Sequence, residues 1–300
     1  MDTNRTEATV INRWQTLTIQ PQKVKADADN LHQAAQLVAM AGKYFIPEAA
    51  DDSHTASRWI ADGNLQLGRM IQGKKLDFNV GLSYPDFAIQ LLTTDLESLA
   101  AFPLDGKTFP EAFQWLHDQL ETQGLDAGGL LPKMHFDIPD HPVKHGKPFR
   151  VENFENMQEL ARHRTNGHLL QQYIRELLHR EEELFIWPHH FDEGLYLPLT
   201  FEGEAPTSSI SIGLAMPDVY YPKPYFYITA WQKEDVIDMK NVKSIFPGQW
   251  HSKEWSGQVL EAHVVTRSDQ TASGQAGLTL HFLRQAINNA LSMVGNSDKI

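Results

Sequence analysis

The spacing of apolar residues changes near residue 183, and this change limits the folds open to the chain. Before it, apolar side chains mostly recur every three or four residues, the spacing of one helix face. From 184 to about 265 they occur in short runs separated by Pro and Gly, which is typical of strands and turns. Helices and strands do not alternate regularly, which argues against a doubly wound parallel sheet. We expect an α+β fold with a mainly antiparallel sheet flanked by helices.

Local signals place several of these elements. Thr108 and Glu111 form a capping box around Pro110, so a helix should begin there and end near Gly124. The turn residues 83–86 separate two strand-like runs, 76–82 and 87–92, and predict a hairpin. The other expected helices are 29–46, 53–73, 153–182 and 273–294, and the other expected strands are 130–138, 184–187, 194–199, 208–214, 225–231 and 258–265.

The domain organisation leaves two interpretations open. Residues 1–12 are polar and are expected to form a flexible tail, followed by a single α+β domain over 13–300. The Gly-Lys-Pro loop within 147–153 is a possible internal boundary. The tripeptide His-Phe-Asp occurs at 135–137 and again at 190–192, so the fold could contain two similar halves. Coincidence in a histidine-rich chain is the alternative.

The charge balance and the lack of cysteine exclude several classes of function. The formal net charge of −12 disfavours nucleic acid and anionic membranes as partners. The chain has no Cys, which excludes disulfides, thiolate catalysis and Cys-zinc sites. It also shows no signal-peptide pattern and no apolar run near the ~20 residues that span a bilayer. We expect a cytoplasmic protein whose oligomeric state the sequence leaves open.

The segment 184–255 is the richest in chemically active side chains. On a strand, His190 and Asp192 would project to the same face, and His251 could supply a third ligand to a divalent metal such as Zn, Mn, Ni or Fe(II). No spacing among the 14 histidines matches a specific metal motif. The alternative is that these histidines are loop residues whose ring nitrogens form hydrogen bonds. Asp192 and Glu254 are the candidate catalytic carboxylates.

The aromatic residues of the same segment could form a ligand pocket. Rings and phenol groups commonly line small-molecule sites. The alternative is an antiparallel sheet rich in strand-forming residues. Neither a Gly-rich phosphate loop nor a nucleophile-elbow motif occurs in the chain. The candidate ligand-binding residues are Trp187, Phe191, Tyr221, Tyr225, Trp250 and Trp255.

Part of this pattern resembles a bacterial domain family of unknown function. The similarity is carried by Trp187 with Phe191-Asp192, then Ser211-x-Gly213, then the Tyr-Pro-x-Pro-Tyr-Phe-Tyr run at 221–227. It extends over about residues 14–232. The resemblance implies positions only, because the family has no activity to transfer. His189 and His190 have no reliable counterpart in it.

Three hypotheses of function follow. The first is metal-assisted hydrolysis of a small polar substrate, with His190, Asp192 and His251 as metal ligands and Glu254 as general base. The second is a non-catalytic module whose Tyr and Trp side chains bind a small ligand or a peptide. The third is a homo-oligomeric structural protein whose aromatic residues form the interface between copies.

Overall fold

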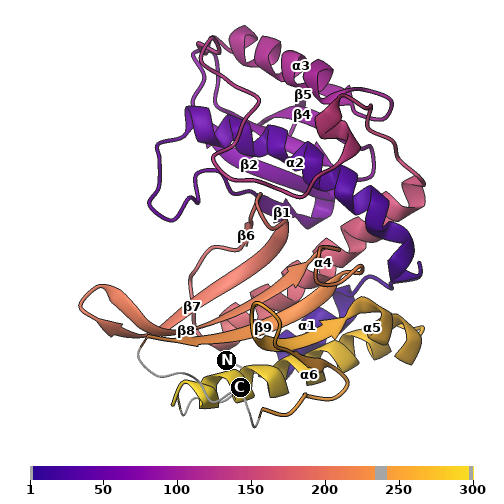
Figure 1. Cartoon of the computed structure of the whole chain (residues 1–300), viewed down its shortest axis with the longest axis vertical. Coiled ribbons are helices and arrows are strands. Elements are labelled where there is room, and N and C mark those ends of the chain that lie inside the picture. Colours follow the sequence, from indigo (N-terminus) through magenta and orange to yellow (C-terminus); the bar gives the residue numbers. More distant parts are fainter. Residues whose placement is uncertain (1–2, 234–241, 297–299) are drawn as a thin grey trace. The chain divides into compact units, whose positions relative to one another are not determined.

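The computed structural model describes residues 3–233, 242–296 and 300, which form two compact units. The first unit comprises Met1–Gln22, Arg162–Leu184 and Glu193–Ile300, and the second comprises Lys23–Ala161 and Phe185–Asp192. Each unit combines helices with antiparallel strands, which confirms the expected α+β class. The segment 147–153 lies inside the second unit. Figure 1 labels the elements.

The second unit contains a five-stranded antiparallel sheet whose strands follow one another in chain order. Helix α2 (Lys25–Phe45) packs on this sheet (Figure 1). The contact is close at Gly68, where an added Cβ would lie 2.8 Å from Val38 Cγ1. The unit also contains α3 (Phe109–Thr122) and the start of α4 (Phe154–Leu177). The strands are β1 (Arg58–Ile60), β2 (Leu65–Ile71), β3 (Phe78–Ser83), β4 (Ala88–Thr93) and β5 (Ser98–Pro103).

Two predictions in this unit are confirmed and one is wrong. The hairpin forms as β3 and β4, and the capping box begins α3 at Thr108. The helix expected over 53–73 is instead β1, a 3-10 turn at Ala61–Gly63 and β2. Asn64 follows this turn in the left-handed conformation at φ 48°, which reverses the chain so that Arg58 pairs with Leu67. A continuous helix cannot contain this reversal.

The strand expected over 130–138 is also wrong. These residues belong to a long loop from about 125 to 153, in which Pro142–His145 forms a 3-10 turn. Met134, Phe136 and Ile138 do alternate with polar residues, as in a strand. The segment pairs with no strand in the described part of the chain, and these three side chains line a cavity instead.

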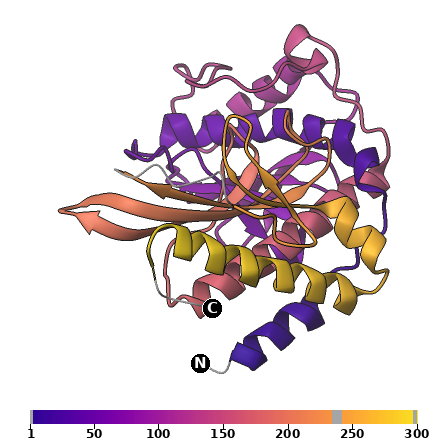
Figure 2. The same cartoon turned by 60° about the horizontal axis from the view of Figure 1, so that its bottom comes forward.

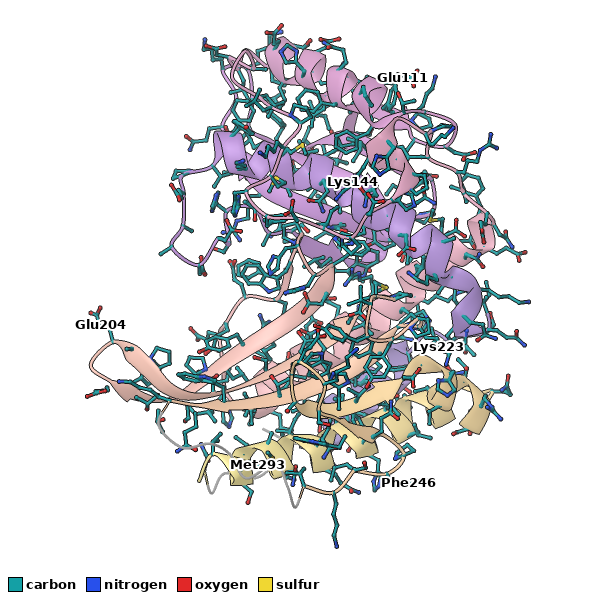
Figure 3. The ribbon with its side chains drawn as sticks, in the orientation of Figure 1. Glu111, Lys144, Glu204, Lys223, Phe246 and Met293 are labelled. Atoms are coloured by element: carbon teal, nitrogen blue, oxygen red, sulfur yellow. The ribbon has the colours of Figure 1, made fainter. Side chains whose placement is uncertain are left out.

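The first unit contains a second antiparallel sheet, in the order β10-β11-β9-β8-β7. Helix α6 (Ala272–Met293) packs along this sheet, as Figure 2 shows. The hairpin between β7 and β8 turns next to Glu204, which Figure 3 labels. The strands are β7 (Asp192–Glu202), β8 (Ala205–Ala215), β9 (Tyr225–Gln232), β10 (Gln249–His251) and β11 (Gly257–Glu261). The short β6 (Phe185–Ile186) belongs to the second unit, where Ile186 pairs with Ser57.

Three helices of the first unit refine the sequence predictions. Residues 1–12 were expected to form a flexible tail, but Thr3–Arg13 form α1, and Glu7 pairs with Arg284 of α6 at 3.2 Å. The strand expected over 258–265 ends at Glu261, where α5 (Ala262–Ser268) begins. Helix α4 runs unbroken through Gly167, whose lack of a side chain gives room to Leu214. Among the described residues, no helix has the length and apolar character needed to cross a membrane.

Candidate ligand-binding cavity

A cavity of about 380 Å³ lies within the second unit. Three segments enclose it: α2, the first turn of α3, and the loop that contains residues 132–146. Its volume falls in the ~300–1,000 Å³ range of small-molecule sites. It is lined by Gln33, Gln36, Met40, Phe109, Pro110, Pro132, Lys133, Met134, Phe136, Asp137, Ile138, Val143, Lys144 and Gly146.

The wall of the cavity is mainly apolar. Met40 of α2 and Met134 of the loop are buried and belong to one cluster, against which Phe109 and Phe136 pack. The charged groups at Lys133, Asp137 and Lys144 are exposed, so they belong to the rim. Lys144 Nζ donates a 2.7 Å hydrogen bond to the backbone oxygen of Ile138, which holds the loop against itself.

The first turn of α3 is fixed by its capping box. The Glu111 carboxylate accepts hydrogen bonds from the Thr108 backbone N–H at 2.8 Å and from its hydroxyl at 2.7 Å. These two bonds, the backbone one first, lower the pKa of Glu111 below its ordinary value. Phe109 and Pro110 lie between the two partners and face the cavity. Figure 3 labels Glu111 at this end of α3 and Lys144 on the loop.

Helix α2 presents two buried glutamines to the cavity. Gln33, Gln36 and Met40 lie three and four residues apart and therefore share a helix face. The Gln36 amide nitrogen donates to the backbone oxygens of Pro188 at 2.8 Å and of His32 at 3.1 Å. The Gln33 amide nitrogen donates to the backbone oxygen of Pro139 at 3.4 Å. The cavity wall is thus tied to a segment far away in the sequence.

That distant segment is the Trp-Phe-Asp motif of the predicted site. In this tight turn the Trp187 N–H donates to the Asp192 oxygen at 2.9 Å, and the Phe191 N–H donates to the Trp187 oxygen at 2.8 Å. His32 of α2 donates through Nε2 to the Pro188 oxygen at 2.9 Å, and its ring stacks on Phe191 with centroids 4.9 Å apart. Phe191 is buried in this contact. Trp187 and Phe191, predicted to bind ligand, do not line the cavity and instead belong to the turn that supports α2.

The two His-Phe-Asp copies both lie in the second unit, and His189, which precedes the second copy, contacts the first. Phe136 packs on His189, with ring centroids 5.5 Å apart, and the rings of His189 and His190 lie 4.4 Å apart. His135 bonds to the Asp52 carboxylate at 3.0 Å. Burial, and then the neighbouring His190, lower the pKa of His189. Because both copies lie in one unit, they are not matching positions of the two units.

The proposed metal ligands are divided between the units. His190 and Asp192 belong to the second unit and His251 to the first. Both ring nitrogens of His251 already have partners: Nδ1 accepts from the Tyr221 hydroxyl at 2.8 Å, and Nε2 donates to the Lys253 oxygen at 2.7 Å. Within residues 3–233, 242–296 and 300, no three His, Asp or Glu side chains are grouped to hold a metal ion.

Three of the remaining predicted residues, Tyr221, Tyr225 and Trp255, belong to an aromatic cluster in the first unit. Tyr221 and Tyr225 pack with Ala215 and Val259, and Trp255 packs against them. Trp255 also stacks on His251, with centroids 4.0 Å apart. These predicted residues therefore lie close together, and their rings pack against one another.

The polar groups of this aromatic cluster are engaged with one another. The Tyr225 hydroxyl donates to Asp218 at 2.7 Å, and the Tyr220 hydroxyl donates to the candidate base Glu254 at 3.0 Å. Glu254 itself is exposed and has a left-handed backbone at φ 70°. Trp250 is half-buried on β10, and its indole N–H has no hydrogen-bond partner among the described residues. The hydroxyl groups of Tyr221 and Tyr225 are thus both hydrogen-bonded within the protein.

The cavity residues were missed by sequence reasoning. Gln33 and Gln36 are polar residues on the buried side of α2, and this conflict with the apolar pattern was the available signal. The proline-rich loop at 139–148 was a second signal, because long irregular segments are often functional. Comparisons of the chain with protein-family models, with curated proteins and with solved structures give no match. The family resemblance therefore stays a hypothesis based on the residues that carry it.

Proposed function

We propose that the protein binds a small, mainly apolar molecule in the cavity on α2. The observation that carries this proposal is the cavity itself, about 380 Å³, with buried Met and Val side chains and partly buried Phe side chains in its wall. It is more than twice the ~150 Å³ of an engineered apolar cavity that holds benzene. The proposal keeps the ligand-binding hypothesis but places the site at the wall residues between 33 and 146 in place of the segment 184–255.

Several contacts support a site that exists before the ligand arrives. The capping box holds Phe109, and the hydrogen bond to Pro188 holds Gln36. Lys43 Nζ donates to the Lys133 oxygen at 3.0 Å, which ties the loop to α2. A preformed wall lowers the ordering cost of binding. Ligand affinity then depends on how well the molecule fills the apolar space.

Calorimetric titration and saturation-transfer NMR with indole test this proposal. Ile138 lines the cavity, so Ile138→Trp should fill it and weaken binding at least tenfold. Leu131 is in the same loop but is 58% exposed and outside the wall, so Leu131→Trp is the matched control and should bind like the wild type. Equal binding by all three proteins, or no binding by the wild type, would contradict the proposal.

A further inference from the structure

We propose that Gln36 makes the cavity selective for molecules that carry a hydrogen-bond donor, such as a hydroxyl or an N–H group. This inference rests on the proposed function, since it names the ligand class of the same cavity. The ligand would be selected by Gln36, whose amide is oriented by the turn at Pro188, and not by the charged residues of the rim.

The orientation of the Gln36 amide follows from its partners. Its nitrogen lies within 2.8 Å of the Pro188 oxygen and 3.1 Å of the His32 oxygen. Both partners are carbonyl oxygens, which only accept, so the group that faces them must be NH₂. The two hydrogens of that group are then used. The amide oxygen, Oε1, is left as the only polar atom that Gln36 can offer to a ligand.

That oxygen has no hydrogen-bond partner among the described residues. No hydrogen bond to Oε1 forms from any residue of the described chain, and Gln36 is only 4% exposed while lining the cavity. An acceptor held in an apolar wall loses contact with water when a ligand fills the space. A ligand without a donor leaves that acceptor unpaired, whereas a donor compensates it.

Gln33 strengthens the preference for a donor. It is one helical turn from Gln36 on the same face and is also 4% exposed. Its amide nitrogen makes one long hydrogen bond, to Pro139, and its oxygen accepts none from the described residues. The buried part of the wall therefore contains two amide oxygens that have no partner among the described residues. The ammonium groups of Lys133 and Lys144 lie on exposed residues of the rim.

A pair of probes that differ in one donor tests the inference. Indole carries an N–H group, and 1-methylindole replaces that hydrogen with a methyl group. The wild type should bind indole roughly ten- to a hundredfold more tightly in calorimetric titration. Gln36→Met keeps a similar length without the amide oxygen, and the preference should fall to about twofold. Gln114→Met, on the exposed side of α3, should keep the wild-type preference.

The possible outcomes separate this inference from the proposed function. If neither indole binds, the proposed function fails. If both bind the wild type equally, or if Gln36→Met keeps the preference, the cavity binds ligands but Gln36 does not select them. A second pair, 4-propylphenol and 4-propylanisole, gives the same comparison in the wild type alone. If Gln36→Met fails to fold, as checked by circular dichroism, equal binding of the two probes of either pair by the wild type still overturns the inference.

Discussion

The side-chain amide of Gln36 donates a 2.8 Å hydrogen bond to the backbone oxygen of Pro188, 152 residues further along the chain. The same oxygen accepts from His32 at 2.9 Å. One carbonyl of the Trp-Phe-Asp turn thus receives two side chains of α2. The turn that attracted attention in the sequence supports the cavity wall, so its effect on ligand binding would be indirect.

Substitutions at His32 should separate the two contacts that hold this turn. His32→Phe keeps the stack on Phe191 but loses the hydrogen bond to Pro188, and should cost about 1 kcal/mol of unfolding free energy. His32→Ala loses both contacts and should cost about 2 kcal/mol. Urea denaturation measures both values. Equal losses in the two variants would show that the stacked ring contributes nothing.

The buried carboxylate of Asp27 should be among the stronger stabilising groups of the second unit. It is 0% exposed and accepts from the Glu152 backbone N–H and from the Asn156 amide, each at 2.8 Å. Asp27→Ala leaves these donors unpaired and should cost about 3 kcal/mol in urea denaturation. Asp29→Ala, which removes a partly exposed ion pair with Lys25, should cost well under 1 kcal/mol. Similar costs for the two variants would contradict this assignment.

Acid should destabilise the protein partly through His163. Burial, followed by the charges of Arg162 and Arg164, lowers its pKa from 6.5 to about 3. Below pH 6.5 the unfolded chain therefore binds a proton at this residue that the folded chain does not. Stability should fall as the pH drops from 6.5 towards 3, and this group alone should remove about 2 kcal/mol between pH 7 and pH 5.

His163→Leu should lack this part of the pH dependence. Urea denaturation of wild type and variant at pH 7, 6 and 5 gives the comparison, with the change of free energy across the pH range as the quantity of interest. The absolute stability of the variant does not affect this comparison. A variant that loses as much stability as the wild type between pH 7 and pH 5 would rule out the role of His163.

The metal hypothesis makes a separate prediction. If His190, Asp192 and His251 bind a divalent ion, protein purified without an affinity tag should contain Zn, Mn, Ni or Fe by elemental analysis. His190→Ala and His251→Ala should each lower that content, and His117→Ala, at a half-buried position of α3, should not. Metal binding at His251 would also have to displace Tyr221 or Lys253 from the ring. Metal-free protein whose Tm responds to neither these ions nor a chelator would reject the hypothesis.

Elements set by neighbouring residues were predictable from sequence. The capping box of α3 needs only Thr108 and Glu111, which lie within one helical turn. The β3–β4 hairpin needs two adjacent runs and the turn between them. In both cases the residues whose interactions decide the structure are close together in the sequence, so the local pattern contains them. The α+β class followed for the same reason.

The alternating segment at 134–138 shows where local pattern was insufficient. Alternation predicts which side chains share a face, and Met134, Phe136 and Ile138 do face one way. Whether that face meets a strand or an open space depends on what lies beside it. At 65–71 the neighbouring strand is present, and the sheet forms where a helix was expected.

By itself, the amino-acid sequence determined the class of fold and the positions of most helices and strands, and it singled out Tyr221, Tyr225 and Trp255 among its candidate site residues. The tertiary structure alone decided where the cavity lies and how the Gln36 amide in its wall is held. The reason is physical: the Gln36 amide is oriented by a backbone carbonyl 152 residues away. A backbone carbonyl is present at every residue, so no side-chain pattern marks the one that will be used.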